Sequence, residues 1–220
     1  MRAFAPADTT LHFTRLVTNE DVTFDNMRSA VGGENLVQAA GMFTLIGVQA
    51  VALACTSMSF AGGRQGESEL LRRIAEVSGT QASTTSTGMA RAFQGLGVRR
   101  VALVTPYVAE INASLVEFLR QCGVSVVALE STEMIRGIAE MTPDDIRTLV
   151  LRACSPEADA VFISCTNLAT AFLIDELEQA AGRPVMSANQ VTIWDALRLG
   201  GLTDLRSVRG WLGQASSNWS

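Results

Sequence analysis

The sequence of 220 residues is poor in the residue types on which common catalytic chemistry depends. It contains one histidine, His12, one tyrosine, Tyr107, and four cysteines. A histidine-based zinc site needs several ligands, which one histidine cannot supply. A Ser–His–Asp or Cys–His catalytic arrangement could use only His12. The chain carries 17 basic against 22 acidic residues, a formal charge of −5, and no basic stripe. These scarcities exclude most histidine-dependent hydrolases and argue against a nucleic-acid partner.

The cysteines are also few for a chain of this length, and none forms a C-x-x-C pair. They are Cys55, Cys122, Cys154 and Cys165. Four cysteines in 220 residues do not make a disulfide scaffold, and Met1–Asp8 lacks the apolar stretch of a secretory signal. We therefore expect a protein of the reducing cytoplasm.

Charge is missing from residues 35–63, a run longer than the ~20 residues that span a bilayer. Glycines, glutamines and a Thr-Ser cluster interrupt this run. The pattern favours a buried helix over about Glu34–Ile46, a C-cap at Gly47 and a buried strand over Gln49–Cys55. We expect no membrane association.

Short aliphatic runs alternate with amphipathic segments along the whole chain. The predicted strands are Leu11–Leu16, Val51–Cys55, Val101–Thr105, Val124–Leu129, Ala160–Cys165 and Pro184–Ser187. The helical patterns are Gly66–Val77, Gly88–Leu96, Ala109–Gln121, Pro143–Cys154, Leu168–Ala181 and Val191–Leu199. Strand–helix alternation of this kind predicts an α/β fold with parallel sheets.

An internal repeat is the most informative feature of the sequence. Residues 50–58, AVALACTSM, match residues 160–168, AVFISCTNL, and each segment is a buried strand ending in Cys-Thr and a small polar residue. A second polar cluster follows each copy, at Ser83–Gly88 and at Ser187–Gln190, and opens a helical segment. Two pseudo-symmetric lobes explain the repeat, and ligands of open α/β sheets bind beyond the carboxyl ends of the strands. Cys55 and Cys165 lie at those ends.

These strand ends offer thiol chemistry. We interpret both Cys-Thr segments as strand-to-helix junctions, where helix N–H groups and the helix dipole lower the thiol pKa from about 8.5. Thr56, Ser57, Thr166 and Asn167 add polar groups suited to a carboxylate, and no metal or organic cofactor is required. Two facing thiols can donate and remove protons, or one can add to an activated double bond.

The other scarce residues have simpler interpretations. Cys122 and Cys154 lie in last helical turns without polar neighbours, which indicates packing. His12, beside Phe13 in a strand-like segment, favours packing or a surface position over catalysis. Tyr107 follows Thr105-Pro106 at a strand end, where it either packs between lobes or donates its hydroxyl to the ligand.

The sequence resembles the aspartate/glutamate racemase superfamily, in the branch of maleate isomerase, arylmalonate decarboxylase and the ectoine-utilisation racemase-like proteins. The resemblance covers nearly the whole chain and rests on Ala54-Cys55-Thr56-Ser57, Ser83-Thr84-Thr85-Ser86, Val104-Thr105-Pro106-Tyr107 with Asn112, Ser164-Cys165-Thr166-Asn167 and Ser187-Ala188-Asn189-Gln190. It implies two Rossmann-like lobes, an active site between them without a cofactor, and a homodimer. The catalytic pair would be Cys55 and Cys165. The substrate-binding residues would be Thr56, Ser57, Tyr107, Thr166, Asn167 and Asn189.

The resemblance also implies a domain division, and the sequence departs from the family pattern in two places. Residues 1–97 with 188–220 would form the first lobe, and residues 98–187 the second. Members usually begin with a strand that ends in a Pro-Ser-Ser-Asn-Thr-like loop, whereas this sequence opens just past it. Either residues precede Met1, or the first lobe lacks this strand. Met58 also stands where glycine is frequent, which narrows the pocket or shifts the loop.

We predict a cofactor-independent isomerase or racemase acting on a small carboxylate or dicarboxylate through Cys55 and Cys165. Because the branch includes a decarboxylase that keeps only the second-lobe cysteine, a lyase using Cys165 as proton donor is one alternative. A non-catalytic member that binds a metabolite is the other.

Overall fold

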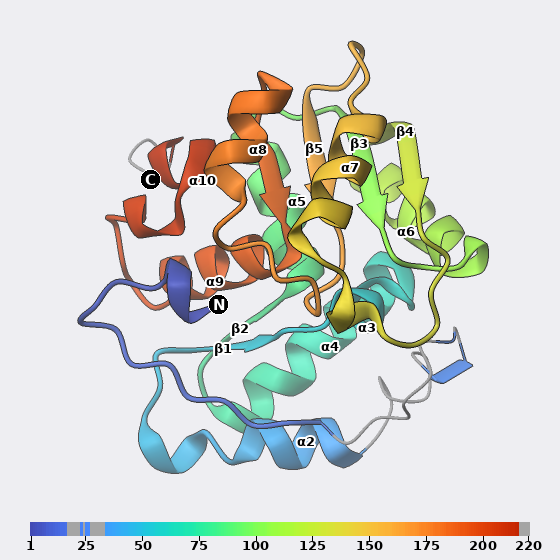
Figure 1. Cartoon of the computed structure of the whole chain (residues 1–220). Helices are drawn as coiled ribbons and strands as arrows, with labels where there is room; N and C mark the ends of the chain where they lie inside the picture. The colour runs from blue at the N-terminus through green and yellow to red at the C-terminus, as the bar shows by residue number, and fades with distance from the viewer. Residues whose placement is uncertain (17–22, 24, 27–33, 216–220) are drawn as a thin grey trace.

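The computed structural model describes residues 1–16, 23, 25–26 and 34–215. Parallel strands alternate with helices along the described chain (Figure 1). The strands are β1 (Ala50–Leu53), β2 (Gln81–Thr84), β3 (Arg100–Thr105), β4 (Ser125–Ser131), β5 (Ala160–Ile163) and β6 (Val185–Ser187). The α-helices are α2 (Glu34–Gly41), α3 (Thr56–Phe60), α4 (Gly63–Ser78), α5 (Thr85–Gly95), α6 (Ala109–Gln121), α7 (Pro143–Ala153), α8 (Ile174–Ala181), α9 (Ala188–Leu199) and α10 (Gly210–Ala215). Short 3-10 turns are η1 (Arg2–Phe4), η2 (Thr44–Ile46), η3 (Ile138–Glu140) and η4 (Arg206–Val208).

The strands form two separate sheets, and every described pairing is parallel. β1 pairs with β2, and a four-stranded sheet has the order β4-β3-β5-β6. Figure 1 shows the two sheets in different parts of the molecule, with α4 and α2 beside the smaller sheet. The predicted α/β fold with parallel sheets is confirmed.

Buried aliphatic side chains explain why the larger sheet forms. Every residue of β5 and β6 is buried, as is β3 after Arg100, which is typical of parallel strands covered on both faces. The helices begin where the sequence predicts caps: Thr142 caps α7 through a capping box with Asp145, and Pro143 occupies the first turn. Gly79 and Gly182 end α4 and α8 in the left-handed conformation.

The internal repeat is a structural repeat. β1 and β5 occupy matching positions 110 residues apart, 50–53 and 160–163. The two polar clusters also play the same local role, because Thr84 caps α5 and Ser187 caps α9 through side-chain hydrogen bonds. The helices α5 and α9 then pack directly on each other between the two sheets (Figure 1).

We propose that the lobes are residues 1–97 with 188–220 and residues 98–187. The packing of α9 supports this division, because α9 follows β6 in the chain but lies against β1, β2 and α5. The four strands of the larger sheet fall within residues 98–187, and both strands of the smaller sheet fall within residues 1–97.

Three expectations about elements are wrong. Leu11–Leu16 pairs with neither sheet, and its two terminal leucines instead pack against different hydrophobic clusters. The helix expected over Leu168–Ala181 begins only at Ile174, because residues 166–173 form turns. No strand was expected at β2, because Gln-Ala-Ser-Thr carries no aliphatic run, and only its last two residues fell within the predicted polar cluster Ser83–Gly88.

The described helices include none that is both long and apolar enough to cross a membrane. The uncharged run of residues 35–63 is divided among α2, η2, β1 and α3. The buried helix expected over Glu34–Ile46 is shorter than predicted, because α2 ends at Gly41 and residues 44–46 form the exposed turn η2. Gly47 ends η2 in the left-handed conformation, as the sequence predicts.

Candidate active site

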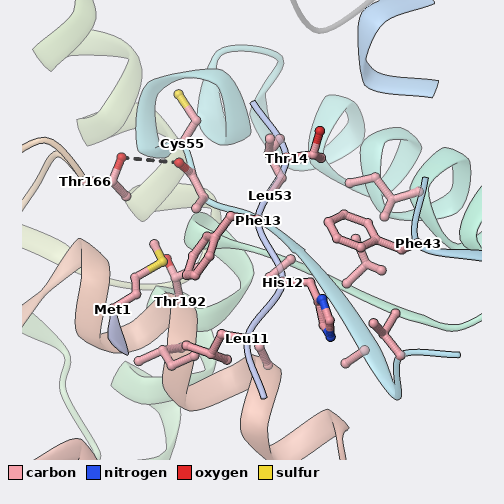
Figure 2. A pocket seen from close by; sticks show the side chains of 18 of the residues that line it. Met1, Leu11, His12, Phe13, Thr14, Phe43, Leu53, Cys55, Thr166 and Thr192 are labelled. Atoms are coloured by element: carbon pink, nitrogen blue, oxygen red, sulfur yellow. Dashed lines mark hydrogen bonds between the residues drawn. The ribbon is translucent and has the colours of Figure 1, made fainter. Parts of the chain in front are cut away.

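A pocket of about 920 Å³ contains the ends of both Cys-Thr segments. It is lined by segments far apart in the sequence: the N-terminal residues 8–16, α2, β1 with the start of α3, the Cys165 loop and α9. Figure 2 shows the stretch from Leu11 to Thr14 passing beside β1 at this pocket. The pocket brings together seven of the predicted site residues: Cys55, Thr56, Ser57, Tyr107, Cys165, Thr166 and Asn167.

Cys55 is the N-cap residue of α3 and is partly buried. The backbone N–H groups of Met58 and Ser57 face its sulfur, and the Ser57 hydroxyl lies 3.9 Å from Sγ. The predicted strand-to-helix junction is therefore correct for the first copy of the repeat.

Cys165 lies in a different backbone setting from Cys55. Turns follow it rather than a helix, so the second strand-to-helix junction is wrong. Its φ is +95°, a conformation that L-residues rarely adopt and that clusters at functional sites. The backbone N–H of Asn167 and the Tyr107 hydroxyl face its sulfur.

Burial is the main influence on the pKa of both thiols. It raises the pKa of the Cys55 thiol above its ordinary value, and it raises that of Cys165 to about 11. The expected lowering by helix N-termini is wrong, because loss of water around the sulfur outweighs the nearby N–H donors. Both groups are thus thiols at neutral pH in this structure, and the nearby Cys55 adds to the rise in the pKa of Cys165.

Tyr107 lines the same pocket as the two thiols and is fully buried. Burial and the neighbouring Cys165 raise its pKa well above the ordinary value, so the phenol remains a hydrogen-bond donor. Ser164 Oγ donates to its hydroxyl oxygen at 3.5 Å, and the Phe60 ring meets its ring edge-on at 6.2 Å. The Tyr107 ring packs against Phe60, and its hydroxyl lies at the pocket, where donation to a ligand stays a prediction.

The loop of Tyr107 is fixed by the partner residue quoted in its motif. Asn112 Nδ2 donates to the Tyr107 carbonyl at 2.8 Å, and Thr105 Oγ1 donates to Asn112 Oδ1 at 2.6 Å. This closed set of hydrogen bonds holds the ring at the carboxyl end of β3.

The polar residues beside the cysteines differ in what their side chains do. Thr56 Oγ1 is buried and meets no partner of hydrogen-bond geometry in the described part of the chain. Thr166 Oγ1 donates to the Ala54 carbonyl at 3.3 Å, which joins the two cysteine loops (Figure 2). Asn189 does not line the pocket, because its amide is used on the Cys165 loop.

Two sets of lining residues were missed in the sequence. Thr192 lines the pocket and its hydroxyl lies 2.7 Å from that of Thr85, a position that helical spacing after the Ser187–Gln190 cluster could have indicated. His12 and Phe13 line it from the N-terminal segment, where the sequence favoured packing or a surface position. No sequence signal marks them, because this segment reaches the pocket without sheet pairing. No cluster of three metal-ligating side chains occurs among the residues that the structure describes.

Comparison with known proteins places this geometry in a family. The family model of arylmalonate decarboxylase matches residues 20–212. The arylmalonate decarboxylase of Bordetella bronchiseptica is 35% identical over 173 residues, which cover 76% of this chain and 72% of that protein. The maleate isomerase of Geobacillus stearothermophilus is 24% identical over 152 residues, covering 67% of this chain and 60% of that protein.

Solved structures show the same fold. The Nocardia farcinica maleate cis-trans isomerase bound to TRIS superposes with a TM-score of 0.87 at 20% identity, covering 98% of this chain and 90% of that one. A double mutant of arylmalonate decarboxylase in its liganded form superposes with a TM-score of 0.78 at 31% identity, covering 82% and 78%. The predicted two-lobe α/β fold is therefore confirmed, and the relatives are enzymes, as expected. The chain belongs to the arylmalonate decarboxylase family, in the cysteine-dependent branch of the aspartate/glutamate racemase superfamily.

Proposed function

We propose that the protein is a cofactor-independent isomerase or racemase that acts on a small carboxylate through Cys55 and Cys165. One observation carries this proposal: both thiols line a single pocket, and the Tyr107 hydroxyl in that pocket faces the Cys165 sulfur. A single-cysteine mechanism would leave the first thiol without a role.

Donors around the thiols suit a substrate carboxylate. The Thr56 hydroxyl is buried at the pocket beside the Tyr107 hydroxyl, and the phenol of Tyr107 remains protonated. The backbone N–H of Asn167 lies on the Cys165 side. When a proton leaves the carbon next to the carboxylate, negative charge moves onto the carboxylate oxygens, and fixed donors stabilise it there.

We infer different roles for the two sulfurs from their surroundings. Cys55 has three donors directed at it, from the Met58 and Ser57 backbones and the Ser57 hydroxyl, which favour its thiolate. Cys165 has a pKa of about 11 and is the proton donor. In a racemisation, Cys55 first loses its proton to water, its thiolate takes the proton from one face of the carbon, and the Cys165 thiol delivers a proton to the other face. In a cis–trans isomerisation, the Cys55 thiolate adds to the double bond, Cys165 protonates the neighbouring carbon, and both steps reverse after rotation.

A decarboxylase-like lyase is the second candidate, favoured by the 35% identity to an arylmalonate decarboxylase. Here the bond between the carbon and one carboxylate breaks, and carbon dioxide leaves. The electron pair of that bond stays on the carbon, and Cys165 protonates the resulting carbanion. The apolar wall of the pocket, which includes Leu36 and Phe43, suits a substituent without charge.

The two candidates are separated by paired serine variants. Maleate is followed by proton NMR, amino dicarboxylates by circular dichroism, and substituted malonates by carbon dioxide release. For a two-thiol enzyme, Cys55→Ser and Cys165→Ser each remove activity, whereas a lyase loses activity only in Cys165→Ser. Cys122→Ser and Cys154→Ser are the matched controls, since neither residue lines the pocket. Full activity in both test variants would contradict either mechanism.

We further propose a cytoplasmic location and a homodimer. All four cysteines are free in the structure, which suits a reducing compartment. Cell fractionation and sedimentation velocity test these proposals, and a purely monomeric species at micromolar concentration would contradict the second.

A further inference from the structure

The loop after Cys165 combines an unusual backbone with little regular structure. Cys165 has a φ of +95°, and residues 166–173 form turns before α8 begins at Ile174. One backbone hydrogen bond, from the Leu168 N–H to the Cys165 carbonyl at 3.3 Å, closes the first turn. This bond is long, so other contacts must hold the loop.

Asn189 supplies such a contact from outside the loop. Its Nδ2 donates to the Thr166 carbonyl and to the Leu168 carbonyl, each at 3.0 Å. Both hydrogens of one amide group are therefore used on carbonyls one and three residues beyond Cys165. A primary amide is suited to this contact, because it presents two donors from one nitrogen.

The helix start that carries Asn189 is itself held in place. Asn189 lies in the first turn of α9, where Ser187 and Gln190 form a capping box. Gln190 Nε2 also donates to the carbonyls of Val208 and Arg209, at 3.2 and 3.1 Å. The helix then packs on α5 and on β1, the strand that leads to Cys55.

A second contact ties the same loop to the first cysteine. Thr166 Oγ1 donates to the carbonyl of Ala54, the residue before Cys55 (Figure 2). Thr166 thus accepts from Asn189 through its carbonyl and donates toward Cys55 through its hydroxyl. Its peptide is held from both sides, and the Cys165 loop cannot shift freely relative to Cys55.

We propose that Asn189 is a positioning residue, whose amide clamps the Cys165 loop to the start of α9 and keeps the Cys165 thiol directed into the pocket opposite Cys55. This inference rests on the proposed role of Cys165 in catalysis. It replaces the expectation that Asn189 binds substrate, because Asn189 acts through Cys165 from outside the pocket.

The test measures the reactivity of each thiol as well as turnover. Asn189→Ala removes both hydrogen bonds, and Asn189→Asp keeps the size but presents oxygens to two carbonyls. Cys165 and Cys55 are alkylated with iodoacetamide over a range of pH and quantified separately by peptide mass spectrometry. Gln190→Ala is the matched control, since it weakens the same helix start without touching the Cys165 loop.

Loosening the loop admits water to Cys165, which lowers the pKa of its thiol. We expect Cys165 in both Asn189 variants to react about tenfold faster at neutral pH, with Cys55 unchanged and Gln190→Ala equal to the parent. Turnover should fall about 100-fold in kcat with little change in KM, as for a displaced reacting group.

An unchanged alkylation rate and pH profile of Cys165 in both Asn189 variants would overturn the proposal, and so would an equal change in Gln190→Ala. The alkylation needs no substrate, so it separates the two hypotheses. If the clamp variants alter Cys165 but the parent converts no carboxylate, the clamp stands and the proposed function fails. If the parent is active and the clamp variants match it in both measurements, only the clamp fails.

Discussion

At the scale of single residues, the site depends on thiols that burial keeps protonated. The pKa of Cys165 is raised to about 11, so nearly all of this residue is ready to donate a proton at neutral pH. In the proposed mechanism the base is then Cys55, whose thiolate is favoured by more donors but opposed by the same burial. A pair of this kind needs one thiol and one thiolate in every turnover, and the surroundings of the two sulfurs determine which is which.

Tyr107 provides the first prediction. Tyr107→Phe removes the hydroxyl that faces the thiols and retains the ring that meets Phe60. We expect kcat/KM to fall on the order of 100-fold, because a fixed donor to developing negative charge is lost. The free energy of unfolding should change by only about 1 kcal/mol. Steady-state kinetics and urea unfolding measure the two effects, and retention of the parental kcat/KM would contradict the assignment.

The candidate site was predictable from the sequence where it depends on the repeat. Cys55 and Cys165 follow matching strands of the repeat, so the sequence was enough to predict that they lie in one pocket. The role of Asn189 was not predictable, because it depends on a loop that forms turns where a helix was expected. The rise in thiol pKa was missed for a similar reason: helix termini can be inferred from sequence, but the depth of burial around a sulfur depends on how distant segments pack.

At the scale of elements, the contact between α5 and α9 sets the distance between the two halves of the repeat. A Cβ on Gly88 would lie 2.4 Å from the Val191 carbonyl oxygen, so the helix backbones would have to separate. We expect Gly88→Ala to reduce the free energy of unfolding by about 1–3 kcal/mol. Gly66→Ala in α4 is the control, where a Cβ meets nothing within 4 Å and a gain of about 0.5–1 kcal/mol is expected. Equal urea midpoints for the two variants would contradict the close approach.

The attachment of α10 provides a prediction about pH. Glu178 in α8 accepts hydrogen bonds from the Trp211 and Val185 N–H groups, and burial raises its pKa from 4.5 to about 7. Because the folded pKa exceeds the unfolded one, the contribution of Glu178 is fully present below pH 4.5 and is lost as the pH rises through about 7.

This loss amounts to about 3 kcal/mol over that range. Glu178→Gln cannot ionise, so its stability relative to the parent should rise by this amount between about pH 4 and about pH 8. Urea unfolding at several pH values, followed by tryptophan fluorescence, measures the difference. A difference that does not vary with pH would show that Glu178 ionises equally well in the folded and unfolded chains.

Which elements were predictable follows from their composition. β1, β3 and β5 are aliphatic runs and were recognised, whereas β2 consists of Gln-Ala-Ser-Thr and is held in place by pairing with β1 and packing against α4 and α9. Leu11–Leu16 has a strand-like pattern but no sheet partner. Strand pairing depends on tertiary packing. The local sequence pattern therefore did not reveal that β2 is paired, and it did not reveal that the N-terminal segment is unpaired.

At the scale of the whole molecule, the two cysteines belong to hydrophobic clusters of very different size. Cys165 is part of the large cluster around the four-stranded sheet, whereas Cys55 packs against a second cluster beside the two-stranded sheet. The buried members of the second cluster are Leu36, Ala40, Val51, Leu53, Met58, Leu70 and Ile74. Because a small core and a two-stranded sheet supply less local stability, this part of the molecule should open before the rest.

Alkylation in increasing urea detects this order of opening. We expect Cys55 to become reactive at a lower urea concentration than Cys165 in the parent. Leu36→Ala, which weakens the second cluster by about 2–5 kcal/mol, should lower the midpoint for Cys55 by about 1 M or more and leave that for Cys165 nearly unchanged. Leu115→Ala in the large cluster is the control and should lower the midpoint for Cys165, while that for Cys55, set by the local opening, changes less. If both thiols become reactive together in the parent and in Leu36→Ala, the two clusters unfold as one cooperative unit, and the proposed catalytic pair is held by a single core.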